Sequence, residues 1–132
     1  MKLLLFASPE KDRARLEKCI EGLTRNPDFD SVVSVDELTG HLCQYINVYA
    51  IMILLITSQE ELYKILSIDK HLNGVKTIII LPDRKPTTIS SALKLHPRYM
   101  TYIDSAFNDV SLVLNHMLGK LQPIKQIQAQ EA

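Results

Sequence analysis

The sequence predicts an open α/β fold, in which helices pack on both faces of a parallel sheet. Two wholly apolar runs, residues 50–56 and 78–81, are typical of strands that are buried on both faces. Strand-like and helix-like segments alternate five times along the chain, and successive parallel strands need such helical crossovers. The 132 residues correspond to about one domain, so we expect a single sheet.

The first three strands are expected at residues 3–7, 29–35 and 50–56 because apolar and β-branched side chains cluster there. Ser8 and Pro9 follow the first strand as an N-cap and a proline in the first helical turn, which predicts a helix from there on. The second helix is expected to begin around Ser34–Glu37. Its inward side chains should be Leu38, Leu42, Tyr45 and Ile46.

The second half of the chain continues the alternation. Ser58 and Glu61 have the spacing of a capping box, which predicts the start of the third helix, and Asn73-Gly74 is a typical helix stop. The remaining elements are expected to be a strand at 78–81, a short helix from Thr87 that ends before Pro97, a strand at 99–103 and a helix from Asn108 to about Leu121.

This order of elements favours a three-layer, flavodoxin-like fold with a five-stranded parallel sheet of order 2-1-3-4-5. Residues 1–121 are expected to form the domain. Residues 122–132 are polar and rich in glutamine after a proline, so we expect them to form a tail or a linker stub.

Composition argues against several classes of function. Fifteen basic and fifteen acidic residues give a formal charge of zero, which provides no overall field for nucleic acid or an anionic membrane. No run approaches the roughly 20 apolar residues of a membrane span, and the apolar start at residues 3–7 is too short for an export signal. We therefore expect a cytoplasmic protein. The two cysteines and four histidines are scattered, so neither a metal site nor a cofactor is predicted.

Ligands of open α/β sheets bind at the carboxyl ends of the strands, and here those ends carry little chemistry. No Asp or Glu lies between Glu37 and Glu60, so the residues at the carboxyl end of the central strand, Leu55, Ile56 and Thr57, carry no charge. None of the four glycines lies in a strand-to-helix turn that could cradle a phosphate. Since no pairing of a nucleophile with a base is evident, we do not expect an enzyme.

Four residues near the expected strand ends carry a family likeness. Arg13 and Leu16 follow the apolar first strand at a characteristic distance, Tyr102 lies in the fifth strand, and Phe107 follows that strand. In these features the chain resembles the receiver domains of bacterial response regulators over about residues 2–121. The resemblance implies a CheY-like version of the flavodoxin-like fold and a role in two-component signalling, with Tyr102 at the aromatic switch position.

The residues that carry the chemistry of that family are missing together. In the family, two acidic residues follow the first strand, an Asp on the third strand accepts the phosphoryl group, a Thr or Ser ends the fourth strand, and Lys-Pro follows the fifth. Phosphoryl transfer to a carboxylate needs that Asp, a divalent cation held by carboxylates, and a cation for the developing charge. The chain therefore resembles a degenerate pseudo-receiver. Its corresponding positions are Ala7, Ser8, Leu55 (or Ile56 or Thr57 in a shifted register), Pro82 and Ser105.

The expected function is that of an adaptor, which binds a partner protein or a second copy of itself as a dimer. The resemblance implies the face formed by the fourth helix, fifth strand and fifth helix, with Leu95, Tyr99, Tyr102 and Leu112 as candidate contacts. Leu95 and Leu112 lie off the inward stripes of their helices, so both are expected to be exposed apolar side chains.

An alternative function is the sensing of a small ligand or anion at the carboxyl edge of the sheet. Ser8, Thr57, Asp83 and Ser105 are its candidate residues, although helix capping accounts more simply for the hydroxyl groups. A displaced cation site would use Glu10, Asp83 and Asp104, but aspartates in loops ordinarily cap helices or shape turns.

Overall fold

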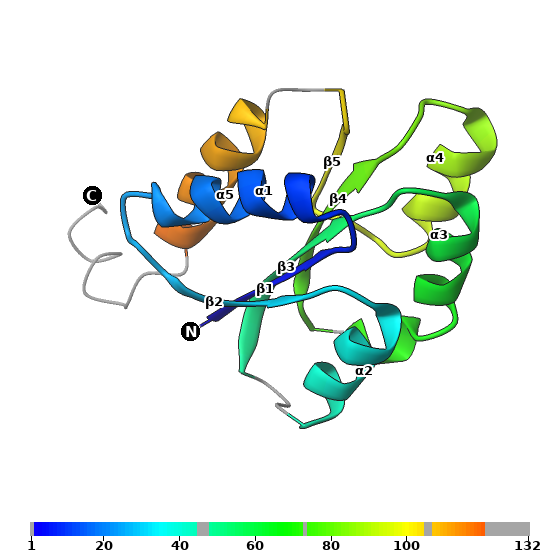
Figure 1. Ribbon diagram of the computed structural model, residues 1–132, viewed down its shortest axis with the longest axis horizontal. Coiled ribbons are helices and arrows are strands. Elements are labelled where there is room, and N and C mark those ends of the chain that lie inside the picture. The colour runs from blue at the N-terminus through cyan, green and yellow to red at the C-terminus, as the bar shows by residue number, and fades with distance from the viewer. Residues whose placement is uncertain (1, 45–47, 73, 105–106, 121–132) are drawn as a thin grey trace.

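The five strands form one parallel sheet of order β2-β1-β3-β4-β5, which confirms the predicted flavodoxin-like topology (Figure 1). This computed structural model describes residues 2–44, 48–72, 74–104 and 107–120. Every pairing between neighbouring strands is parallel. The strands are β1 (Lys2–Ala7), β2 (Asp28–Val32), β3 (Tyr49–Leu55), β4 (Lys76–Leu81) and β5 (Tyr99–Tyr102).

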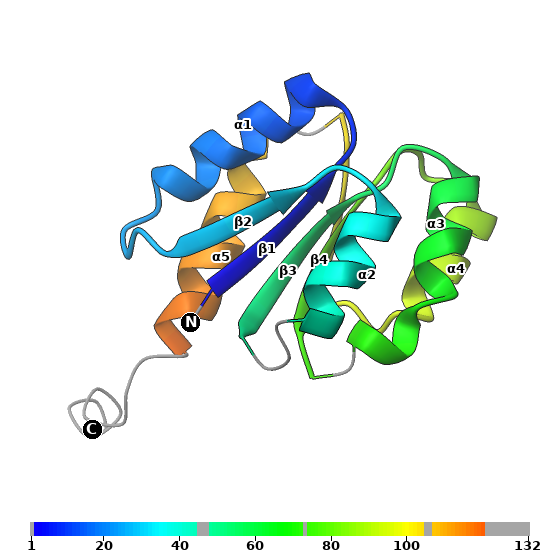
Figure 2. The same cartoon turned by 60° about the horizontal axis from the view of Figure 1, so that its bottom comes forward.

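The helices cover both faces of the sheet, as the alternating pattern predicts. Figures 1 and 2 show α1 and α5 side by side on one face and α2, α3 and α4 on the other. The helices are α1 (Glu10–Glu21), α2 (Val35–Gln44), α3 (Gln59–Leu66), α4 (Pro86–Leu93) and α5 (Asn108–Lys120), with a short 3-10 helix, η1 (Asp69–Leu72), after α3. Among the described helices, none has the length and apolar character that crossing a bilayer requires.

The central strand β3 is buried on both sides, and its side chains alternate between two hydrophobic cores. Ile53 and Leu55 pack with the apolar stripes of α1 and α5. Met52 and Leu54 pack with the stripes of α2 and α3 on the opposite face. This alternation explains why residues 51–56 are wholly apolar, since neither face of that stretch meets water.

Two capping boxes start the helices that follow β2 and β3, and both confirm the predicted starts. The backbone N–H of Glu61 donates to Ser58 Oγ over 3.1 Å. At α2, the Glu37 N–H donates to Ser34 Oγ over 3.1 Å, and the Glu37 carboxylate accepts from the N–H of Val33 over 2.8 Å. The cap at Ser34 also explains why β2 ends at Val32, three residues earlier than expected.

The predicted cap of α1 is wrong, and the predicted inward face of α2 is confirmed for the residues that the structure describes. Ser8 is not the N-cap of α1, because Pro9 occupies that position in an extended conformation and α1 begins at Glu10. The hydroxyl of Ser8 instead forms a contact with α3 that is described below. On α2, Leu38 and Leu42 are buried as expected, whereas Tyr45 and Ile46 lie outside the described residues.

A polar network crosses the edge of the sheet at which β1 and β3 begin. Asp30 on β2 accepts a hydrogen bond from the hydroxyl of Tyr49, and Lys2 forms an ion pair with it over 3.2 Å. His41 Nδ1 lies 3.1 Å from the same Tyr49 hydroxyl. The Tyr49 hydrogen bond, and after it the ammonium of Lys2, hold the pKa of Asp30 below its usual value despite partial burial.

Asp30 is expected to make stability depend on pH. Because the folded-state pKa lies below the unfolded value of 3.8, the carboxylate stabilises the fold at higher pH and this contribution is lost as pH falls through the folded-state pKa. Asp30→Asn should lower the free energy of unfolding by about 1 kcal/mol at pH 7, with a smaller deficit below pH 4. Urea unfolding at several pH values would measure this. Asp28→Asn, an exposed position on the same strand, is the control and should change little.

Candidate functional site

The carboxyl edge of the sheet, where the loops after β1, β3, β4 and β5 meet, is the place where this fold ordinarily carries its site. The strands end level there: Ala7 pairs with Leu55, and Leu55 pairs with Ile80. The Ile56 N–H extends the ladder by donating to the carbonyl of Ile80 over 2.8 Å. Side chains that follow β1 and β3 are therefore neighbours in space.

The end of the central strand is part of the core. Leu55 and Ile56 are both 0% exposed, Leu55 in the core beneath α1 and α5 and Ile56 in the core beneath α2 to α4. Thr57 is the first side chain after β3 to reach solvent. A charged group at Leu55 or Ile56 would lose its hydration without gaining a partner.

The carboxylate of Glu61 joins two of the loops at this edge. One oxygen accepts from the backbone N–H of Thr57 over 2.9 Å and from the Thr57 hydroxyl over 3.0 Å. The other oxygen accepts from the hydroxyl of Ser8 over 3.2 Å. On the β1 side, the Arg13 guanidinium donates to the carbonyl of Ala7 over 3.1 Å. The loops after β1 and β3 are thus tied to each other by side chains.

The two aspartates of this edge are both engaged in hydrogen bonds, Asp83 within its own loop and Asp104 with the loop after β4. Asp83 accepts from the backbone N–H of Lys85 over 2.9 Å, and this bond, followed by one to Thr88, holds its pKa below the usual value. Both terminal nitrogens of Arg84 donate hydrogen bonds to the carboxylate of Asp104, over 2.8 and 3.1 Å, and this pairing lowers the pKa of Asp104. The same guanidinium lies over the ring of Tyr102, 4.1 Å from its centre.

The start of α5 is fixed by Phe107. Its side chain is fully buried, and its backbone adopts a left-handed conformation with a φ of 63°. The guanidinium of Arg15 on α1 lies 4.4 Å from the centre of the Phe107 ring. A left-handed conformation is uncommon for a bulky residue, so we expect the buried ring and its cation contact to hold the backbone there.

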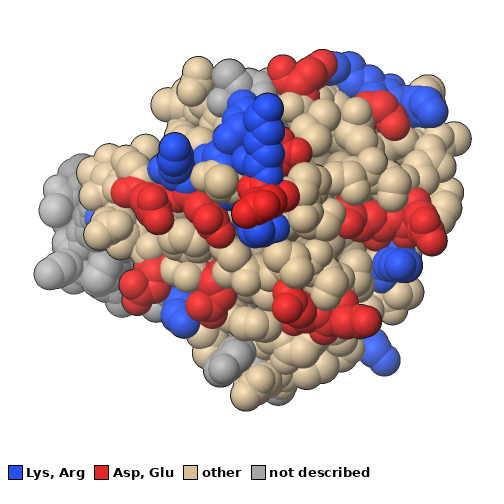
Figure 3. All heavy atoms as spheres, viewed as in Figure 1, with Lys and Arg blue, Asp and Glu red and all other residues tan. Residues whose placement is uncertain are grey.

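The structure brings together only part of the predicted ligand edge. Ser8 and Thr57 share the Glu61 carboxylate, whereas Asp83 is used in its own turn, and Ser105 lies outside the described residues. The displaced cation site of Glu10, Asp83 and Asp104 is not formed, because no cluster of three or more acidic, histidine or cysteine side chains suited to a metal occurs among the described residues. On the face shown in Figure 3, acidic and basic side chains are interspersed.

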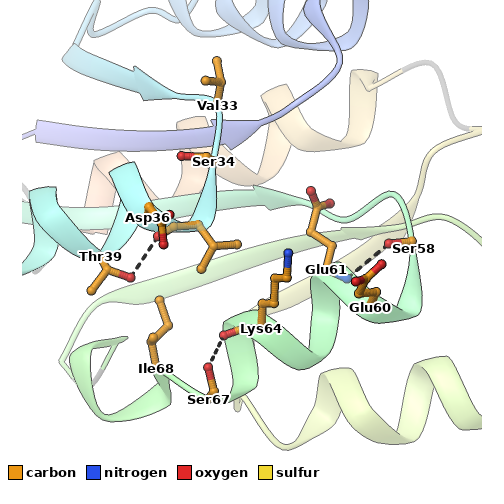
Figure 4. Close-up of a pocket in the computed structure, with 11 residues that line it drawn as sticks. Val33, Ser34, Asp36, Thr39, Ser58, Glu60, Glu61, Lys64, Ser67 and Ile68 are labelled. Carbon is orange, nitrogen blue, oxygen red and sulfur yellow. Dashed lines mark hydrogen bonds between the residues drawn. The ribbon is translucent and has the colours of Figure 1, made fainter.

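A crevice between α2 and α3 is a feature that the sequence did not reveal (Figure 4). It has a volume of about 490 Å³ and opens beside the loops after β2 and β3. Of its polar side chains, Ser34 and Ser58 are engaged as helix caps. The sequence signal that could have indicated this crevice is the pair of capping boxes at Ser34 and Ser58, because they mark the starts of two helices that lie on the same face of the sheet. The lining residues are Val33, Ser34, Val35, Asp36, Thr39, Ser58, Glu60, Glu61, Lys64, Ser67 and Ile68.

Comparison with known proteins identifies relatives in structure only. No protein-family model and no curated protein sequence matches the chain. A two-component response regulator from Clostridium difficile is similar with a TM-score of 0.73 and 14% identity, covering 93% of this chain and 99% of its own. A CheY-like receiver domain protein from Methanospirillum hungatei is similar with a TM-score of 0.73 and 9% identity, covering 90% of this chain and 94% of its own. A proposed pilus assembly protein, CpaE, from Burkholderia thailandensis has a TM-score of 0.71 and 11% identity. The match covers 89% of this chain and 98% of that protein.

The chain has the CheY-like receiver fold. This confirms the fold that the resemblance implied, and identities of this size establish the fold alone. Ala7 is the last residue of β1 and Ser8 follows it, Leu55 is the last residue of β3, and Pro82 follows β4. Ser105 is outside the described part of the chain.

Of the residues expected on the face formed by α4, β5 and α5, Leu112 is 71% exposed, and Tyr99 and Tyr102 are half-buried. The expectation that Leu95 is exposed is wrong, since it is only 8% exposed and packs in the core with Ala92. Because α4 ends at Leu93, Leu95 lies in the following turn, and its N–H bonds to the Ala92 carbonyl over 3.0 Å. The exposed leucine of α4 is Leu93, at 52%.

The packing role of Leu55 leads to a stability prediction. Leu55→Asp should lower the free energy of unfolding by about 3 kcal/mol or more, because it leaves an unpaired polar group in the core. Leu55→Met keeps the volume and should cost less than about 1.5 kcal/mol. Urea unfolding would measure both variants. Equal stability of the two would show that the end of β3 tolerates a carboxylate.

Proposed function

We propose that this chain is a non-phosphorylated, receiver-fold signalling or adaptor module that acts by binding proteins in bacterial signal transduction. The observation that carries the proposal is the end of β3, where Leu55 and Ile56 are fully buried and Thr57 is bonded to Glu61. An acyl phosphate can form only on a carboxylate, and none of these three side chains has one.

The surroundings of β3 also support a module without phosphoryl chemistry. Ala7 and Ser8 provide no carboxylate for a divalent cation, and oxygen ligands of that kind are what Mg²⁺ requires. Asp83 and Asp104, the nearest acidic side chains in the loops after β4 and β5, are bonded to Lys85 and Arg84. These contacts favour a structural role for the edge.

The proposed binding surface is the α4–β5–α5 face, made by those three elements. Thr87 contacts Gln59 of α3, so at 100° per residue Leu93 lies on the other flank of α4, toward β5. Asp109 accepts hydrogen bonds from Tyr99 and Thr101 of β5, and Leu112 follows it by nearly one turn of α5. Two exposed leucines therefore flank the edge strand.

Those side chains define the kind of partner that the face fits. Leu93 and Leu112 offer exposed apolar area, while half-buried Tyr99 and Tyr102 offer aromatic area between them. Protein interfaces have apolar, aromatic centres of this kind surrounded by polar groups. The proposed occupant is the apolar patch of a folded protein, which includes a second copy of this chain in a homodimer.

Phosphorylation reagents test the first half of the proposal. Incubation with acetyl phosphate and Mg²⁺ should add no phosphoryl group to the intact mass, and beryllofluoride should leave the amide NMR spectrum unchanged. A response regulator that retains its phosphoacceptor Asp, treated in parallel, shows that the reagents are active. A mass increase of one phosphoryl group would contradict the proposal.

Substitution of Leu112 tests the second half. Leu112→Asp should abolish self-association or partner capture, because a charge in the centre of an interface loses its hydration. Light scattering and pull-down with native-host extract would measure this. Tyr63→Asp is the matched control, since Tyr63 is also an exposed large side chain, at 55%, but lies on α3. If both variants behave like the unmodified chain, the face is not the interface.

Small-ligand binding is a second candidate, supported by the crevice between α2 and α3 (Figure 4). The crevice opens beside the ends of β2 and β3, on either side of β1, where the strand order reverses and open α/β sheets commonly bind ligands. Asp36, Glu60 and Lys64 line it, which suits a zwitterionic or cationic ligand better than an anion. Thermal stabilisation by free amino acids that Lys64→Ala removes would favour this candidate over the adaptor.

A further inference from the structure

Side-chain contacts link the loops of the carboxyl edge into a closed ring. Going round the edge, each loop, or the helix that follows it, contacts the next one, although these segments are far apart in the sequence. The four contacts are Ser8 with Glu61 (3.2 Å), Gln59 with Thr87 and Thr88 (3.3 and 3.2 Å), Arg84 with Asp104 (2.8 Å), and Arg15 with Phe107 (4.4 Å to the ring centre).

We propose that Glu61 is an internal anion that closes this ring, so that the carboxyl edge keeps one conformation without any bound anion. Glu61 would thereby hold the β1 and β3 loops together from within the chain. This inference goes beyond the adaptor role, because it concerns how the edge is held whichever partner binds.

Three donors that converge on one carboxylate support the proposal. The Thr57 N–H and hydroxyl and the Ser8 hydroxyl all donate to Glu61, over 2.9, 3.0 and 3.2 Å. Hydrogen bonds to an ionised acceptor are roughly twice as strong as those between neutral groups. No ion pair joins Glu61 to a cation in the described part of the chain, so its charge is balanced by these hydrogen bonds and by the N-terminus of α3.

The Ser8 bond separates this arrangement from an ordinary capping box. A capping box satisfies donors at the start of its own helix, as the Thr57 N–H does here. Ser8 is 53 residues away in sequence, at the end of a different strand. Its loop is itself held by Arg13, which donates to the carbonyls of Ala7 and Ser8 over 3.1 and 3.4 Å. Glu61 therefore meets a donor whose position is set by another element.

Hydrogen exchange measured by NMR tests whether the bond couples the two loops. Ser8→Ala should speed exchange of the Thr57 amide about tenfold, although Ser8 does not touch that amide, because the carboxylate that binds it becomes freer to move. If Glu61 served only as a local cap, Ser8→Ala would leave the Thr57 amide unchanged, and this result would overturn the proposal.

Chemical rescue tests whether the carboxylate acts as an anion. Glu61→Ala should lower the melting temperature and leave the Ser8 and Thr57 donors free, so that added acetate recovers part of the loss at constant ionic strength. Glu60→Ala is the matched control, because Glu60 is the adjacent exposed acid and none of these bonds involves it. The control should show neither the loss nor the recovery.

A failure of rescue would overturn the proposal, as would equal rescue of both variants. If Glu61→Ala does not fold, Glu61→Gln tests the charge alone, since it keeps an acceptor but removes the charge: it should lower the melting temperature, whereas Glu60→Gln should not, and equal melting temperatures of the two variants would overturn the proposal. These measurements are made on the isolated chain, so their outcome is independent of whether Leu112 lies in an interface or whether the chain resists phosphorylation.

Discussion

The burial of β3 on both faces is the constraint on which the rest of the structure depends. The strand pairs with β1 on one side and β4 on the other, and helices cover it above and below. Full burial of an aliphatic side chain stabilises a fold by about 1.5–3 kcal/mol, and six consecutive side chains from Ile51 to Ile56 are 0% exposed. Such a strand gains its contribution from packing, and it leaves no place for a charged side chain before Thr57.

This constraint shifts the polar chemistry of the edge from the strands to the helix starts. The carboxylate nearest the end of β3 is supplied by the first turn of α3, as Glu61, and it points back to donors in the loops. Two cations of the edge are also bonded within the fold: Arg13 donates to a backbone carbonyl, and Arg84 donates to Asp104. Charged groups that could act on a ligand thus act mainly on the fold.

Side-chain contacts at this edge also hold α4 and α5 against β5. Arg84 contacts both Tyr102 and Asp104, so the loop that leads into α4 is held against β5. Asp109 performs the same task for α5 by accepting from Tyr99 and Thr101. The elements that carry Leu93 and Leu112 are therefore fixed relative to the strand between them, and a partner would meet a preformed surface with little ordering cost.

Local patterns in the sequence determined the order and type of the elements and the inert ends of the strands. The apolar runs at 50–56 and 78–81 and the Ser58–Glu61 capping box could be interpreted directly, because burial on two faces and helix capping depend on neighbouring residues. Which side of α4 faces the core could not be predicted in this way, since a short helix with weak amphipathicity has several plausible inward faces. Leu95, which was expected to be exposed on this helix, lies beyond its end.

Only the tertiary structure decided which groups meet. The partner of Ser8 is 53 residues away, and the crevice between α2 and α3 depends on two helices that follow non-adjacent strands. Spacing along the chain carries no information about such pairs until the sheet order and the side-chain directions are known. The sequence thus determined that no Asp or Glu lies between Glu37 and Glu60. The fold decided that Ser8 and Thr57 meet the carboxylate of Glu61, because only the tertiary structure brings the loops after β1 and β3 together.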